Sequence, residues 1–108
     1  MAIEITDAVL LDARHEFSFA ELVEFSGCTE GDLRELMDYG ALLPEHPEAA
    51  QWSFRGEFVV AVRTAVRLRD DLELDLPAVA LALKLIHRIH VLEGQLREAQ
   101  AQLPQPHR

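Results

Sequence analysis

Apolar residues recur at helical spacing in several stretches of the chain, and glycine, proline and capping residues separate those stretches. In the first stretch, Leu22 and Phe25 share one face of a helix. Ser18 is a natural N-cap with Glu21 three residues later, which is the pattern of a capping box, and Gly27 suits the residue that ends a helix. The pattern therefore predicts a first helix between Ser18 and Gly27.

A second, shorter helix follows after a tight turn. Thr29 is its expected N-cap, Leu33, Leu36 and Met37 share its apolar face, and Gly40 ends it. Two short helices joined by such a turn are typical of a helix-turn-helix unit.

Short apolar segments near this unit predict strands. The run at about residues 8–12 favours one strand, and segments 41–44 and 51–54 flank a polar loop. We expect these two segments to pair as the small hairpin called a wing. Trp52 has two interpretations: it packs against the helix that follows, or it anchors a partner, since Trp is enriched at binding hot spots.

Two longer helices complete the chain. A valine-rich stripe predicts a helix over about residues 56–71. Asp75 is the expected N-cap of a last helix that reaches about Leu103, and Pro77 is tolerated in its first turn.

The last helix carries a heptad repeat along one face. A second apolar face, with Val79, Leu83 and Ile86, is present only in the first half, which we therefore expect to pack on the globular body. In the second half the narrow seam would stay exposed on a single helix, so we expect two copies to pair, unless the helix folds back on its own domain. The residues of the predicted dimer interface are Leu85, Ile89, Leu92, Leu96 and Leu103.

These elements predict a mainly α fold with a small two-stranded wing. A winged helix-turn-helix module is expected over residues 1–74, a long packing and dimerisation helix over 75–103, and a disordered tail over 104–108. The length of 108 residues suits one small domain.

The amino-acid composition indicates the class of protein and the cellular compartment to expect. Apolar residues make up 49% of the chain, which favours a globular protein over a disordered one. No apolar window is long enough to span a membrane, so we expect no membrane partner. Cys28 is the only cysteine and the first residues lack the features of an export signal, so we expect a cytoplasmic protein without disulfides.

Charge is distributed unevenly along the chain. The net charge is −9, and residues 1–58 hold thirteen acidic residues against three basic ones. The outward face of the second helix concentrates this excess, with Glu30, Asp32, Glu35 and Asp38 against Arg34. Because cations supply much of the affinity for DNA, this face disfavours nucleic acid and favours a basic protein surface.

No arrangement for catalysis or metal binding stands out. Cys28 lies in a turn as a small apolar residue, and His87 and His90 lack a third ligand at suitable spacing. Asp70 and Asp71 are more simply a solvated helix end than a catalytic pair. We expect a protein that is not an enzyme and has no metal and no cofactor.

The order of elements resembles the MerR family of transcription regulators. The resemblance covers residues 18 to about 103 and rests on "FAELVEFSGCTEGDLRELMDYGALLP" (19–44) and "WSFRGEFVVAVRTAVRLR" (52–69). In that family the second helix and the wing carry basic and aromatic residues that grip phosphates. Here the second helix has a net charge of −3, and the wing has Glu45 and Glu48 without Arg or Lys, so no DNA partner is expected.

A narrower resemblance links the chain to the CbpM family of chaperone modulators. It rests on "AVRLRDDLELDLPAVALALKLI" (65–86), preceded by "GALLP" and "WSF". The resemblance implies a protein that binds the J-domain of a DnaJ-like co-chaperone, CbpA, and inhibits its activity toward a DnaK-type chaperone. It implies that the modulator covers the basic helix of the J-domain that docks on that chaperone.

Two acidic surfaces compete for the expected partner. One is the outward face of the second helix, with Glu30, Asp32, Glu35 and Asp38; the other is the turn before the last helix, with Asp70, Asp71 and Glu73. The alternative function is a MerR-like transcription regulator that binds DNA through Arg63, Arg67 and Arg69. A small-molecule sensor that uses the junction between the body and the long helix is a third possibility.

Overall fold

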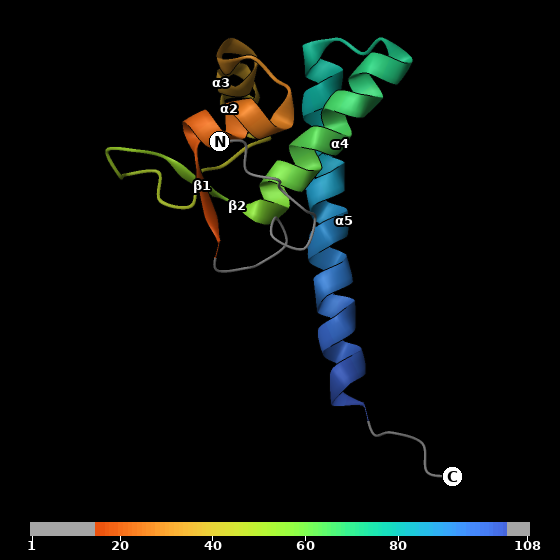
Figure 1. Ribbon diagram of the computed structural model, residues 1–108. Helices are drawn as coiled ribbons and strands as arrows, with labels where there is room; N and C mark the ends of the chain where they lie inside the picture. Colours follow the sequence, from red (N-terminus) through yellow and green to blue (C-terminus); the bar gives the residue numbers. More distant parts are fainter. Residues whose placement is uncertain (1–14, 104–108) are drawn as a thin grey trace.

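The computed structural model describes residues 15–103 and is mainly helical over that range. Figure 1 shows α2, α3 and the small sheet on one side of α4 and α5, with the second half of α5 extending beyond the body. The described elements are β1 (Glu16–Ser18), α2 (Phe19–Ser26), α3 (Glu30–Asp38), β2 (Ser53–Arg55), α4 (Gly56–Leu72) and α5 (Leu76–Gln102). The predicted fold class is confirmed; the division between residues 74 and 75 stays a prediction, and residues 104–108 lie outside the described range.

The helix-turn-helix unit begins and ends at the predicted residues. The Ser18 hydroxyl accepts the N–H of Glu21 at 3.1 Å, and the Glu21 carboxylate accepts the N–H of Ser18 at 2.9 Å, so the capping box is present. Gly27 has φ +80°, a left-handed conformation that favours glycine, and ends α2. The Thr29 hydroxyl accepts the N–H of Asp32 at 3.1 Å and starts α3. Local signals therefore define both helices.

The small sheet has a different partner strand from the one predicted. β1 pairs with β2 in antiparallel register, with Phe17 opposite Phe54. The predicted hairpin between 41–44 and 51–54 is wrong, because Ala41 and Leu42 are both buried and residues 41–52 form a loop rather than a strand. Consecutive buried residues do not fit the alternation of a half-exposed strand. The strand expected at 8–12 lies outside the described residues.

The core lies between α4 and the elements that surround it. Helix α4 contributes fully buried Val59 and Val62, and it packs against α2, β2 and α5. The largest side chains in this core come from several elements: Phe17, Leu22, Leu33, Leu36, Leu42, Phe54, Val79 and Leu83. Each buried apolar side chain of this size contributes roughly 1.5–3 kcal/mol relative to exposure.

The two halves of α5 lie in different environments. The Asp75 carboxylate accepts the N–H of Ala78 at 3.0 Å and caps the helix, and Pro77 lies in the first turn, as predicted. Val79, Ala80 and Leu83 are buried against the body, whereas within residues 84–103 no side chain is fully buried. The expected packing of the first half on the body is confirmed.

Candidate protein-interaction surfaces

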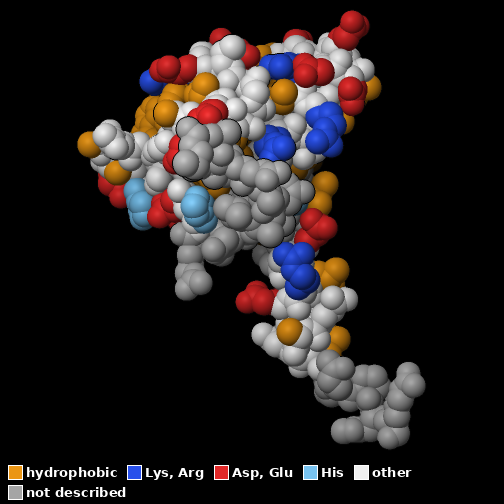
Figure 2. Space-filling model, viewed as in Figure 1, with side chains coloured by type: hydrophobic (Ala, Val, Ile, Leu, Met, Phe, Trp, Pro, Cys, Tyr) orange, Lys and Arg blue, Asp and Glu red, His pale blue; other side chains and the backbone are white. Residues whose placement is uncertain are grey.

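The outward face of α3 is acidic. Leu33 and Leu36 are fully buried and hold the other side of the helix to the core. Figure 2 shows acidic side chains at the end of the molecule that is formed by α3 and the turn between α4 and α5. The predicted residues of the outward face are exposed or half-buried on this helix: Glu30, Asp32, Glu35 and Asp38.

The single basic residue of α3 is engaged within the protein. Arg34 donates from Nε and Nη2 to Glu30 Oε1 at 3.2 and 3.0 Å. Its guanidinium carbon lies 5.2 Å from the ring centroid of Phe19 and 5.5 Å from that of Trp52. An exposed ion pair contributes up to about 1 kcal/mol and an exposed cation–π contact about 0.5–1 kcal/mol, so neither is strong alone. Arg34 thus leaves the face acidic in character.

A second arginine joins the two acidic surfaces that the sequence treats as alternatives. Arg69 Nη1 lies 3.7 Å from Asp32 Oδ2 on α3, and Arg69 Nε donates to Asp70 Oδ1 on α4 at 3.1 Å. Because one side chain contacts both, the outward face of α3 and the end of α4 are neighbours. We refer to the two surfaces together as the acidic end; its acidic residues are Glu30, Asp32, Glu35, Asp38, Asp70, Asp71 and Glu73.

The turn between α4 and α5 completes the acidic end. Asp70, Asp71 and Glu73 are exposed there. Glu73 has φ +54°, a left-handed conformation that is uncommon for a residue with a side chain, and it caps α4 through its N–H to the Arg69 carbonyl. The Leu74 N–H donates to the same carbonyl at 3.1 Å. These hydrogen bonds hold the turn, and therefore its carboxylates, against the end of α4.

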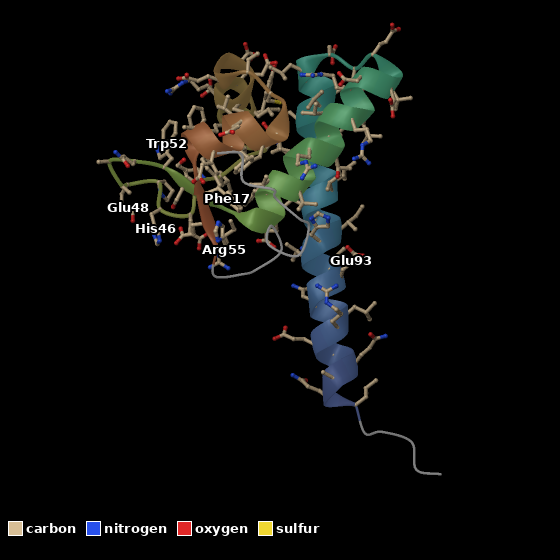
Figure 3. All side chains as sticks on the ribbon, viewed as in Figure 1. Phe17, His46, Glu48, Trp52, Arg55 and Glu93 are labelled. Atoms are coloured by element: carbon tan, nitrogen blue, oxygen red, sulfur yellow. The ribbon has the colours of Figure 1, made fainter. Side chains whose placement is uncertain are left out.

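A groove borders the acidic end where α2, α3 and the loop of residues 41–52 meet. The Phe19 and Trp52 rings are edge to face, with centroids 5.7 Å apart, and Arg34 lies over both. The ring contact with Phe19 comes from α2 and the cation–π contact with Arg34 from α3, and Trp52 is also packed against the hydrophobic core. Figure 3 shows Trp52 beside α2, at the end of the loop that carries His46 and Glu48. Two adjoining depressions, of about 520 and 440 Å³, share Arg34 and Trp52 in their lining.

Sequence reasoning did not find this groove. Its lining comes from three separate stretches: Ser18, Phe19 and Ala20; Arg34, Met37 and Asp38; and Ala50, Gln51 and Trp52. The available signal was the hot-spot propensity of Trp52 together with a lone arginine on an acidic helix.

An apolar seam follows the projecting half of α5. The residues of the predicted dimer interface are large and exposed, with exposed fractions of 55% for Leu85, 53% for Ile89, 45% for Leu92, 57% for Leu96 and 63% for Leu103. The helix does not fold back over them. Figure 2 shows hydrophobic side chains along the edges of this projecting helix.

The arginines of α4 differ in their surroundings. Arg69 is held by Asp32 and Asp70, which leaves it a poor phosphate ligand. Arg63 and Arg67 line a small polar depression of about 200 Å³ with Val60 and Thr64. The three residues of the DNA-binding alternative therefore do not form one free basic surface.

The cysteine and the histidine that the sequence raised as candidates for chemistry are both packed against other parts of the protein. Cys28 is buried, and burial raises the pKa of its thiol above the ordinary value. His87 stacks on Phe58 with ring centroids 4.3 Å apart. Among residues 15–103, no three His, Cys, Asp or Glu side chains gather as they would around a metal ion. No helix in that range combines the length and the apolar character needed to cross a membrane.

Comparisons with known proteins identify the family. The family model described as MerR HTH family regulatory protein matches residues 17–100. A protein of Salmonella arizonae named chaperone modulatory protein CbpM is 34% identical over 87 residues, which cover 81% of this chain and 82% of the relative. Relatives of that name from Salmonella paratyphi B and Salmonella newport are each 34% identical over 82 residues, 76% of this chain and 77% of the relative. The chain belongs to the CbpM family of MerR-like proteins.

Membership in the CbpM family confirms the narrower resemblance, for which residues 65–86 were the sequence evidence. This segment forms the second half of α4, the turn and the first half of α5. It thus supplies part of the acidic end and the packing face of α5 together. The MerR-like resemblance is confirmed as well, and the second helix of the helix-turn-helix, α3, is acidic in this chain.

Proposed function

We propose that this protein is a non-enzymatic chaperone modulator of the cytoplasm. In this proposal it binds the J-domain of a DnaJ-like co-chaperone, CbpA, and inhibits its activity toward a DnaK-type chaperone. The names of the CbpM relatives support the general role. The acidic end, with its one α3 base already paired to Glu30, is the observation that carries the choice of a basic partner.

Electrostatics explains how the acidic end would select its partner. Carboxylates grouped on one surface attract a basic protein over several ångströms and repel an acidic one. The same field repels DNA, whose affinity for proteins depends on cations. A modulator that covers the basic helix of the J-domain with this surface prevents that helix from docking on the chaperone, so inhibition requires binding alone and no chemistry.

We also propose that a second copy of the chain covers the apolar seam. Large side chains exposed at heptad spacing favour helix pairing, since burying one contributes roughly 1.5–3 kcal/mol. The seam is on the half of α5 that extends beyond the body, so a partner helix can reach it (Figure 1). The dimer leaves the outward face of α3 available, because the seam and α3 lie on different parts of the molecule.

A titration tests the proposed function directly. Isolated J-domain is added to the protein in a calorimeter at low and at moderate salt, and the chaperone's ATPase is measured with and without the protein. We expect binding that weakens with salt, and loss of J-domain stimulation of the ATPase at saturation. Absence of binding at both salt concentrations contradicts the proposal. A gel shift with duplex DNA at low salt tests the alternative, and we expect no retardation.

A further inference from the structure

We propose that the groove between α2, α3 and the loop of residues 41–52 receives an apolar side chain that projects from the basic surface of the J-domain. This inference rests on the proposed function and adds the contact that positions the partner. The occupant is a helix that combines lysines or arginines with one aliphatic or aromatic side chain. We call the depression the aromatic groove and define it by Phe19, Arg34, Met37, Ala50 and Trp52, which line it.

The walls of the aromatic groove are anchored in the core. Phe19 is the first residue of α2, and its ring lies 6.3 Å from that of Phe54, which is fully buried. Trp52 directly precedes β2 and packs edge to face on Phe19 at 5.7 Å. Both rings remain only half-buried, so each keeps an open surface. A partly exposed tryptophan ring is a frequent anchor of protein interfaces, and the phenylalanine ring extends the apolar surface beside it.

Arg34 already lies over both rings in the unbound protein. Its guanidinium lies 5.2 Å from one ring and 5.5 Å from the other, and Glu30 fixes its orientation through two hydrogen bonds. A preorganised surface loses less side-chain entropy on binding than a flexible one. Because Glu30 offsets the charge of Arg34, the groove does not present an unpaired cation that would attract an acidic ligand.

The aromatic groove is large enough for one apolar side chain of the partner helix and the residues beside it. The two depressions have volumes of about 520 and 440 Å³ and meet at Arg34 and Trp52. Volumes of roughly 300–1,000 Å³ are typical of sites that enclose small ligands. A single large apolar side chain fills part of one depression while the residues beside it lie over the other.

Acidic residues at the edge of the aromatic groove favour a basic partner. Asp38 lines one depression, and Glu35 lies three residues earlier on the outward face of α3. Aromatic and aliphatic walls with a carboxylate at the rim match a basic helix that carries an apolar anchor, since a lysine or arginine of that helix meets Asp38. A second copy of this chain is a poor occupant of the groove, because residues 1–58 of that copy hold thirteen acidic residues against three basic ones.

Trp52 provides a direct probe because it is the only tryptophan in the chain. In a ¹⁵N-labelled sample its indole N–H gives a single resonance, and unlabelled J-domain contributes none. We expect this resonance to shift or broaden in proportion to occupancy as J-domain is added. An unchanged indole resonance under conditions where calorimetry shows saturation overturns the inference and leaves the proposed function intact.

A matched pair of variants tests the groove without removing any core side chain. Ala50 is exposed and lines the groove, whereas Ala49 is exposed beside it and lines neither depression. Ala50→Arg and Ala49→Arg add the same charge, so long-range attraction changes equally. We expect Ala50→Arg to weaken J-domain binding at least tenfold and Ala49→Arg to change it less than twofold. Equal affinities for the two variants overturn the inference, whereas absence of binding by the unmodified protein overturns the proposed function itself.

Discussion

The outward faces of α3 and of the second half of α5 differ in chemistry. On α3, carboxylates lie opposite Leu33 and Leu36, which are buried. On α5, Leu92 and Leu96 remain exposed although they repeat at the spacing of a packed seam. The first face is stable in water as it is, whereas the second exposes apolar surface that another helix can bury. The difference supports the two proposed associations, in which a basic partner contacts α3 and a second copy pairs along α5.

The two kinds of association should respond differently to salt. Exposed charges are screened within about 10 Å at 0.1 M ionic strength, so binding at the acidic end should weaken as salt rises. Burial of apolar surface does not depend on charge, so pairing through the seam should persist. This contrast separates the two surfaces experimentally.

The largest expected effect is loss of the dimer in Leu92→Asp. Two copies of the seam would each bury an unpaired carboxylate, which costs several kcal/mol. Light scattering or sedimentation should show the mass fall from that of a dimer to that of a monomer. Ala101→Asp is the matched control, since it adds the same charge on the opposite side of α5, and it should remain dimeric. A dimer that survives in Leu92→Asp contradicts pairing through the seam.

Two leucines that lie close together in the sequence allow the stability contributions of the two sides of α5 to be compared. Leu83 is fully buried and Leu85 is 55% exposed. With dissociation removed by the Leu92→Asp background, Leu83→Ala should lower the free energy of unfolding by about 2–5 kcal/mol. Leu85→Ala should change it by no more than about 0.5 kcal/mol, as for other surface substitutions. Urea denaturation measures both, and similar losses would mean that the seam packs within a single chain.

A smaller effect is expected when charge is reversed on α3. Glu35→Lys with Asp38→Lys should weaken J-domain binding by roughly tenfold, which corresponds to about 1.4 kcal/mol. The double variant Glu93→Lys with Glu98→Lys changes the net charge equally on the projecting half of α5 and should have little effect. Asp70→Lys with Asp71→Lys, measured in the same calorimeter, shows whether the turn contributes. If only this last pair weakens binding, the outward face of α3 is not the contact surface.

The features that could be predicted from the sequence are those encoded by near neighbours. Ser18 and Glu21 form a capping box over three residues, and Thr29 and Asp75 cap their helices over the same distance. The heptad spacing on α5 likewise needs no tertiary information, and the leucines that it singled out, Leu85, Leu92, Leu96 and Leu103, are exposed in the single chain. Charge periodicity identified the outward face of α3 for the same reason.

The features that could not be predicted join distant parts of the chain. β1 is only three residues long, and Glu16 meets Ser53 across 37 positions, so neither strand carries a signal for the other. Sequence proximity favoured the hairpin instead. The contact of Arg69 with Asp32 also joins distant parts of the chain. Because the sequence gives no sign of this contact, it presents the acidic face of α3 and the end of α4 as alternatives although they are neighbours.

The smallest expected effect comes from Cys28, which lies beneath the acidic end. Burial is the main cause of its raised pKa; nearby Arg69 lowers the pKa, while Asp32 and Asp70 raise it. The folded protein therefore holds the thiol proton more tightly than the unfolded chain, whose cysteine titrates near pH ~8.5. Stability from this group is complete below that pH and is lost as pH rises toward the folded pKa.

Substitution of Cys28 should isolate that loss. The free energy of unfolding of the unmodified protein should fall relative to that of Cys28→Ala as the pH rises above about 8.5, because only the former has a thiol to ionise. Denaturant titrations at a series of pH values measure the difference. Asp70→Asn should reduce this pH-dependent difference, because removal of a nearby carboxylate lowers the pKa of the thiol. Glu98→Gln is the control: it removes a charge from the projecting half of α5 and should leave the difference unchanged. Parallel pH profiles for the unmodified protein and Cys28→Ala would mean that the thiol ionises equally easily in both states.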